Sequence, residues 1–255
     1  MVLRYLYLIR GSWPRLVELI YWPAVQVLIW GFITLFLVTK STFFAQASGI
    51  LLSAVLLWDV LFRAQLGVSL SFFEEMWSRN LGHLMVSPLR PHEFVLGLLI
   101  MSLVRTLIGF LPASLLAIAF FGISVYELGL TLVAFFANLA IMGWAIGIAV
   151  SGIVLRFGLG AEGFAWALVF ALAPLCGIYY PLDILPHWAQ AIAAWLPAAY
   201  IFEGMRAILI DHQVRYDLLG RAAALNVVYM IAGGAVFLAF LGAARVRGSL
   251  LQMGE

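Results

Sequence analysis

The chain contains six apolar stretches, each close to the length that crosses a lipid bilayer. An α-helix rises about 1.5 Å per residue, so a hydrocarbon core of roughly 30 Å requires about 20 apolar residues. The stretches cover approximately residues 20–38, 49–72, 94–121, 130–155, 163–180 and 222–243. Only 10% of the residues are charged and 65% are hydrophobic, which excludes a water-soluble protein. The sequence therefore predicts an all-α integral membrane protein with six transmembrane helices.

Several classes of functional site are excluded by the residues that are missing. The only lysine, Lys40, does not follow the glycines of a phosphate-binding P-loop. His92 begins a zincin pattern, but Leu96 occupies the position of its second histidine. A single cysteine, Cys176, allows neither an internal disulfide nor a thiolate metal cluster. We therefore expect no catalytic residues, no metal and no cofactor, and the scattered arginines predict no nucleic-acid partner.

The positions of the basic residues predict that both termini are cytoplasmic. Six spans place the two termini on the same side of the membrane. On that side lie Arg4, Arg10, Arg15, Arg79, Arg90, Arg156, Arg245 and Arg247, and on the other side lie Lys40, Arg206, Arg215 and Arg221. Cytoplasmic loops carry the excess of basic residues, so the side with the termini is expected to face the cytoplasm.

The chain begins with an amphipathic segment. Residues 1–19 combine Arg4, Arg10, Arg15 and Glu18 with leucine, tyrosine and tryptophan side chains. Such a segment is expected to form a helix that lies along the cytoplasmic interface and does not cross the membrane. Residues 20–246 would then form a single transmembrane domain.

The external segment between the fifth and sixth spans contains two short apolar runs, residues 187–196 and 198–210. Neither run is long enough to cross the bilayer. Pro181, Pro186 and Pro197 punctuate the runs at positions typical of helix starts. We therefore predict a re-entrant or interfacial helical hairpin at the outer leaflet, in which Glu203 and Arg206 lie one turn apart and can pair.

The polar loop between the second and third spans predicts a short amphipathic helix that ends at Val86. Leu81, Leu84 and Met85 fall on one face, and Ser87-Pro88 then breaks the helix. An apolar helix face of this kind suits docking into a groove on a soluble partner. An ordinary loop helix resting on lipid headgroups explains the pattern equally well.

Three charged residues fall inside predicted spans, where each costs about 2.5–3.5 kcal/mol at a helix centre. Asp59 and Arg63 lie one turn apart and can pair, whereas Arg105 needs an acceptor from another helix or from water. The three residues could line a polar path for an amphipathic substrate. Alternatively, the pair only neutralises itself, which we favour, and Arg105 anchors packing; for Arg105 both alternatives stay open.

Small residues recur every four positions in the fourth span, at Gly143, Gly147 and Ser151. This spacing lets helix backbones approach closely. We favour packing within one subunit over a seam between two subunits.

Two segments resemble a known family. The segment "NLGHLMVSPLRPHEFVLG" is similar to the cytoplasmic loop of type-2 membrane-spanning subunits of ABC transporters, of the kind that export drugs, lipids and lipo-oligosaccharides. The segment "YYPLDILPHWAQAIAAWLPAAYIFEGMR" resembles the external segment of the same family. The two motifs occur in the family's order, and together with six spans and a matching length they cover nearly the whole chain.

The resemblance implies a permease that pairs with a second copy of itself or with a sister permease and binds two separate ABC ATPase subunits. ATP hydrolysis would occur on those subunits, so this chain would not be an enzyme. It would lie in the cell (inner) membrane and export a hydrophobic or amphipathic drug, lipid or lipid-linked glycan. The alternative function is a non-transporting polytopic membrane scaffold or receptor, which predicts no ATPase partner.

The resemblance also implies roles for particular residues. The helix that couples the permease to the ATPase would include Leu81, Leu84, Met85, Ser87 and Pro88. The hairpin at the outer gate would include Pro181, Leu185, Pro186, Trp188, Pro197, Glu203 and Arg206.

Overall fold

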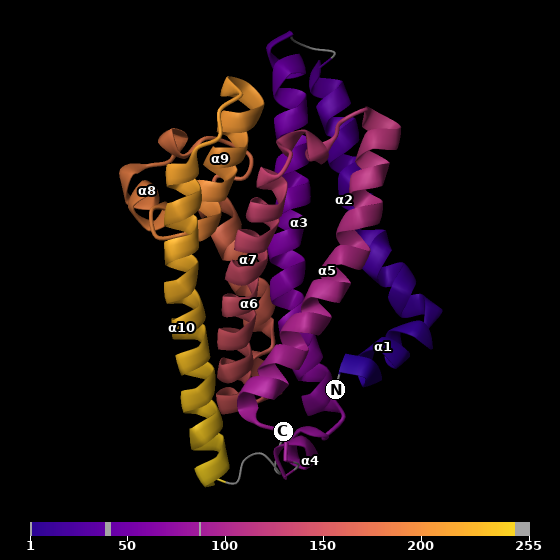
Figure 1. Cartoon of the computed structure of the whole chain (residues 1–255), viewed down its shortest axis with the longest axis vertical. Helices are drawn as coiled ribbons and strands as arrows, with labels where there is room; N and C mark the ends of the chain where they lie inside the picture. Colours follow the sequence, from indigo (N-terminus) through magenta and orange to yellow (C-terminus); the bar gives the residue numbers. More distant parts are fainter. Residues whose placement is uncertain (1, 39–41, 87, 248–255) are drawn as a thin grey trace.

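The computed structural model describes residues 2–38, 42–86 and 88–247, and within these ranges every regular element is a helix (Figure 1). The α-helices are α1 (Val2–Arg10), α2 (Trp13–Val38), α3 (Thr42–Trp77), α4 (Leu81–Val86), α5 (Pro91–Phe121), α6 (Thr131–Phe157), α7 (Gly163–Leu172), α8 (His187–Ala193), α9 (Pro197–Asp211) and α10 (Tyr216–Arg247). Short 3-10 turns are η1 (Val125–Leu128), η2 (Leu159–Ala161), η3 (Ala173–Leu175) and η4 (Leu182–Ile184).

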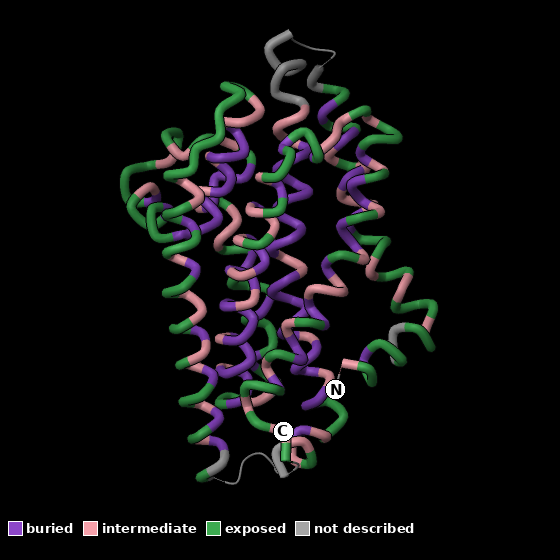
Figure 2. Tube along the Cα trace, in the orientation of Figure 1, coloured by how far each residue is buried: buried purple, intermediate pink, exposed green. Residues whose placement is uncertain are grey.

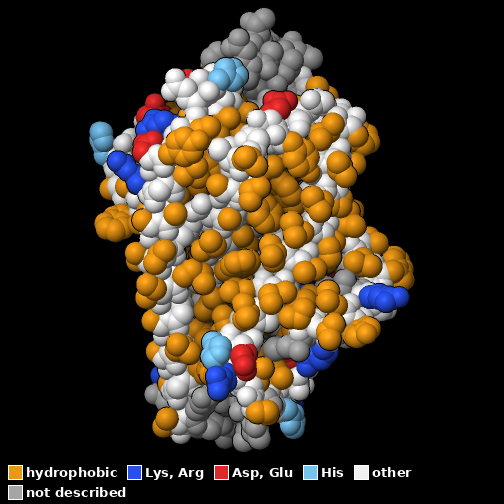
Figure 3. Space-filling model, viewed as in Figure 1, with side chains coloured by type: hydrophobic (Ala, Val, Ile, Leu, Met, Phe, Trp, Pro, Cys, Tyr) orange, Lys and Arg blue, Asp and Glu red, His pale blue; other side chains and the backbone are white. Residues whose placement is uncertain are grey.

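Five of these helices are long and apolar enough to cross a membrane: α2, α3, α5, α6 and α10. Helices α8 and α9 form a pair bent by 98°, and counting that pair as one span raises the number to six. In the space-filling view an apolar belt covers the middle of the molecule, and most charged side chains lie near its two ends (Figure 3). The prediction of an all-helical membrane protein is therefore confirmed, and where six spans were predicted the described helices provide five, or six with the bent pair.

Helices α3 and α6 form the centre of the bundle. In the most apolar part of α3 72% of the residues are buried, compared with 22% in α2 and in α10. Figure 2 shows this difference as a mostly buried trace in the middle and a trace that alternates between buried, intermediate and exposed along α10. Helix α10 packs on α6, and α2 and α5 pack on α3. The outer helices therefore present their apolar residues to lipid, whereas α3 contacts protein on most sides.

Glycines on α6 allow it to approach α3 closely. A Cβ atom at Gly143 would lie 2.6 Å from the Leu61 carbonyl oxygen, and one at Gly147 would lie 2.8 Å from the Gln65 carbonyl oxygen. Both glycines therefore face a neighbouring helix of the same chain, which confirms packing within one subunit. Ser151 continues the stripe and donates to the Gly147 carbonyl oxygen at 2.8 Å.

The return path after α6 differs from the predicted fifth span, residues 163–180. Helix α7 ends at Leu172 and continues only through η3, so the apolar helix Gly163–Leu175 is about 20 Å long. Pro174 cannot donate a backbone hydrogen bond, and Gly177 has a φ of +64°, so the chain turns there. The predicted fifth span is therefore shorter than expected, and the bent pair α8 and α9 occupies the segment in which a helical hairpin was predicted.

Helices α8 and α9 begin where the prolines indicated. Pro186 precedes the first residue of α8, and Pro197 is the first residue of α9. Proline is favoured at a helix start because the first backbone N–H groups have no partner inside the helix.

The N-terminal segment is divided at Gly11 and Ser12. Helix α1 ends at Arg10, and α2 begins at Trp13 and continues as the first long span. Residues 13–19 are therefore part of a long helix, whereas Val2–Arg10 forms a separate helix that packs on α5 and α2. Tyr5 is buried in that contact beside Met101.

We expect Gly143→Ala to destabilise the bundle, because its methyl group would lie against the α3 backbone. Overpacking of this kind costs typically about 1–3 kcal/mol. The measurement is the midpoint of thermal unfolding in detergent. The matched control is Gly234→Ala on α10, where an added Cβ meets nothing within 4 Å and should leave the midpoint unchanged or raise it. Equal midpoints for the two variants would contradict close packing of α3 and α6.

Candidate functional site

A cavity of about 650 Å³ lies between α2, α3, α5 and α7, which we call the α3 cavity. One face of α3 forms its long wall, because Asp59, Phe62, Arg63, Leu66, Gly67, Leu70 and Glu74 recur at three- and four-residue spacing. The wall from Asp59 to Glu74 spans about 22 Å along the helix. Trp166 and Phe170 of α7 add aromatic side chains, which lie 5.9 Å and 5.8 Å from the Phe62 ring. The cavity is therefore elongated, with apolar walls interrupted by charges.

The structure brings the three intramembrane charges that the sequence singled out to this one cavity. Arg63 Nε donates to Asp59 Oδ2 at 2.6 Å, so the predicted pair within one turn is formed. Arg63 lies across Gly109 of α5, where a Cβ atom would come within 2.8 Å of its Nε. The glycine therefore leaves room for the guanidinium between the two helices.

Arg105 finds its acceptor at the end of α3. Its Nη2 lies 3.2 Å from Glu74 Oε2 and 3.4 Å from Glu74 Oε1. Glu74 is three residues from the last residue of α3, so the Arg105 guanidinium extends toward that helix end. The backbone beside it lies deeper in the bundle, because Ser102 packs against Gly67 and donates to the Ala64 carbonyl oxygen at 2.7 Å. Arg15 of α2 approaches the same carboxylate, with Nη1 3.9 Å from Oε1. We call Arg15, Glu74 and Arg105 the Glu74 cluster.

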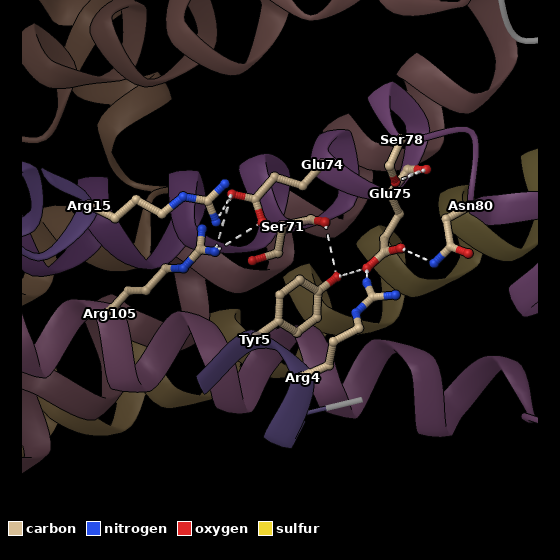
Figure 4. A network of polar contacts seen from close by, with 9 residues as sticks. All are labelled: Arg4, Tyr5, Arg15, Ser71, Glu74, Glu75, Ser78, Asn80 and Arg105. Atoms are coloured by element: carbon tan, nitrogen blue, oxygen red, sulfur yellow. Dashed lines mark hydrogen bonds and ion pairs between the residues drawn. The ribbon is translucent and has the colours of Figure 1, made fainter. Parts of the chain in front are cut away.

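The adjacent carboxylate, Glu75, is fully buried and joins three elements (Figure 4). It accepts from the Tyr5 hydroxyl and forms an ion pair with Arg4, both on α1. Asn80, immediately before α4, donates to its Oε2 at 2.8 Å. Burial raises the pKa of Tyr5 to about 12, so this hydroxyl remains a donor at neutral pH. The Glu75 network, formed by Arg4, Tyr5, Glu75 and Asn80, thus ties α1 and the start of α4 to the end of α3.

A second cavity, of about 660 Å³, lies beside the Glu75 network, and we call it the α1 cavity. Arg15, Glu74 and Trp77 line both cavities. The two cavities therefore meet at the Glu74 cluster. In Figure 1, α1, α4 and the end of α10 all lie at this end of the bundle.

Helix α4 exposes less of its apolar face than the sequence suggested. Leu81 is only 2% exposed and packs in the main hydrophobic core, so its side chain anchors the helix to its own bundle. Leu84 is half-buried against the same core, while His83 and Pro88 are exposed. The Met85 side chain and Ser87 lie outside the part of the chain that the structure describes.

At the opposite end, Glu203 links α9 to the turn before α8. Its Oε1 accepts from the Leu182 backbone N–H and from Arg206 Nη2, both at 2.9 Å. The pair that the sequence placed one turn apart is therefore present, with Arg206 almost buried. Tyr179 stacks on Trp30 of α2, with ring centroids 4.8 Å apart, which attaches the hairpin to the first long helix.

The other residues that the sequence analysis assigned to an outer gate lie at the turns around α8 and α9. Pro181 precedes η4, Leu185 and Pro186 connect η4 to α8, and Pro197 is buried at the start of α9. Trp188 is exposed on α8. None of these residues reaches the α3 cavity.

Sequence reasoning did not identify the two carboxylates that organise the site. From hydropathy the second span was predicted to end at Phe72, so Glu74 and Glu75 were expected in the following loop. In the structure α3 continues to Trp77 and includes both carboxylates. The helical spacing from Asp59 through Leu66 and Leu70 to Glu74 is the signal that could have extended the helix. Within residues 2–38, 42–86 and 88–247 no three His, Cys, Asp or Glu side chains are close enough to share a metal ion.

Comparison with known proteins identifies the family. The sequence model of the ABC-2 type transporter family matches residues 10–210, which include α2 to α9 and both cavity walls on α3 and α7. No curated protein matches the chain. Because the match covers well over half of the residues, the chain belongs to the ABC-2 type transporter family.

Proposed function

We propose that this chain is the membrane-spanning subunit of an ATP-driven exporter that moves an amphipathic substrate out of the cytoplasm or the inner leaflet. Membership of the ABC-2 family makes the chain a transport component that works with an ABC ATPase, and it favours transport over a scaffold or receptor role. The observation that carries the proposal further is the α3 cavity, because it combines aromatic walls with ion pairs. A path of this composition suits a substrate with both apolar and polar parts.

In this proposal the transporter contains a second copy of the chain or a sister permease, and lies in the cell (inner) membrane with both termini in the cytoplasm. The bent pair α8 and α9 forms the outer gate. Helix α4 contacts the ATPase, and Asn80 passes its displacement to α3 through Glu75. Because one face of α3 lines the α3 cavity, a movement of α3 changes the shape of that cavity.

We expect Leu84→Asp to weaken the association with the ATPase by about tenfold or more, because a buried leucine contact contributes roughly 1.5–3 kcal/mol. The measurement is the amount of ATPase that is retained by the tagged permease in mild detergent. The control is Leu130→Asp, at a residue that is 90% exposed immediately before α6 and far from α4. This control should retain the ATPase fully.

Leu84 also packs on the hydrophobic core of its own chain, so Leu84→Asp can affect folding as well as docking. Leu84→Ala, a milder change, is therefore measured together with Leu84→Asp. Normal ATPase retention by Leu84→Asp with an unchanged unfolding midpoint would remove the coupling assignment. A tagged wild-type chain that never retains a nucleotide-binding protein would remove the exporter proposal.

The proposed orientation predicts a labelling pattern for introduced cysteines. The native Cys176 is buried, so it should contribute little background. An impermeant maleimide should modify the Leu130→Cys variant in intact cells, whereas the His83→Cys variant in α4 should react only after the membrane is opened. Reaction of His83→Cys in intact cells would place α4 outside the cytoplasm and reverse the topology.

A further inference from the structure

The Glu74 cluster has more cationic than anionic charge. Two guanidinium groups, Arg15 and Arg105, face one carboxylate, which leaves one positive charge at the point where the two cavities meet. Asp59 is paired with Arg63 and Glu75 with Arg4. Glu18 also lines the α3 cavity, so three arginines and three carboxylates balance over the cavity as a whole, and the excess of positive charge is confined to the groups that contact Glu74.

The two arginines also have unused hydrogen-bonding capacity. Arg105 contacts Glu74 through Nη2 alone, although a guanidinium has five N–H donors. The 3.9 Å approach of Arg15 to Glu74 is too long for a hydrogen bond. The Arg15 side chain is 46% exposed and that of Arg105 is 11% exposed, so one arginine lies at the mouth and the other lies deeper. An anion with several acceptor oxygens could bridge both arginines.

From this cluster the α3 cavity continues along a mostly apolar wall, which the Asp59–Arg63 pair interrupts at its far end. Along α3 the next residues on the cavity wall are Leu70, Gly67 and Leu66, followed by Phe62 at the aromatic contact with α7. A molecule with its charge at the Glu74 cluster would therefore place an adjoining chain against apolar side chains. The order of polar and apolar parts matches that of an amphipath.

We propose that the Glu74 cluster binds the anionic headgroup of an amphipathic substrate, whose apolar part lies along the Leu70 to Phe62 wall of the α3 cavity. Glu74 is the counter-ion of Arg15 and Arg105, and an incoming headgroup displaces it from them. This inference rests on the proposed export function, since it names the class of substrate for that cavity. It assigns Arg15 and Arg105 to headgroup binding and Glu74 to competition with the headgroup.

The test is the binding of lysolipids to the purified full chain in detergent, measured by native mass spectrometry. Lysophosphatidic acid and lysophosphatidylcholine with the same acyl chain differ in the net charge of the headgroup. We expect the wild type to bind lysophosphatidic acid about tenfold more tightly, as charged hydrogen bonds imply. Equal affinity for the two lysolipids would overturn the proposal.

Variants separate headgroup binding from a merely structural role. Arg15→Gln and Arg105→Gln should each reduce the preference for lysophosphatidic acid about tenfold, whereas Glu74→Gln should increase its affinity because the competing carboxylate is gone. Arg10→Gln is the control, since Arg10 is exposed on α1 and lines neither cavity. If Glu74→Gln instead lowers the affinity as much as Arg15→Gln does, the cluster only holds the helices together. Arg15 is half-exposed, so its variant is expected to fold even where Arg105→Gln does not.

Two further outcomes are informative. One distinguishes a lipid headgroup from a free anion, and the other distinguishes failure of the headgroup site from failure of the exporter proposal. If inorganic phosphate displaces lysophosphatidic acid at equal concentration, the site binds free anions. That result would overturn the proposal that the ligand is an amphipath. Binding is measured without an ATPase, so a headgroup preference in a chain that retains no ATPase counts against the exporter proposal alone. Normal ATPase retention without a headgroup preference counts against this inference alone.

Discussion

The cost of placing charge inside an apolar bundle is the constraint on which this structure depends. A charged side chain is tolerated there only opposite a partner or beside a cavity that admits water. The described part of the chain meets both conditions, because Asp59 pairs with Arg63 and Glu74 with Arg105, and all four line the α3 cavity. The partners of each ion pair therefore neutralise each other, and together they form the polar part of the cavity wall.

Helix α3 connects the features that a transporter must coordinate. Its middle packs against α6 through glycine contacts, one face lines the α3 cavity, and its end carries the Glu75 network. Adjacent residues on a helix point about 100° apart, so Glu74 faces the cavities' junction while Glu75 faces α1 and Asn80. A displacement of α4 would therefore reach α3 through Asn80, which lies in the short connection between the two helices.

Local pattern predicted the features that depend on neighbours along the chain. Hydropathy located the long helices, proline positions marked the starts of α8 and α9, and four-residue spacing identified both the Asp59–Arg63 pair and the glycines that face α3. The same reasoning was wrong where a contact with another helix decided the outcome. Leu81 appeared to belong to a docking face but is buried in its own bundle, and the predicted fifth span is interrupted near Pro174.

The sequence by itself determined that this chain is a helical membrane protein, because only a lipid bilayer can cover so many apolar residues, and it predicted six spans. The structure gives five, or six with the bent pair. The sequence also determined that a few charges must be accommodated among those spans. Only the tertiary structure decided that Arg105 meets Glu74, 31 residues away, and that Tyr5 meets Glu75, 70 residues away. Such pairs depend on how far each helix extends and on where it packs against its neighbour, and neither is encoded in the spacing of residues along one helix.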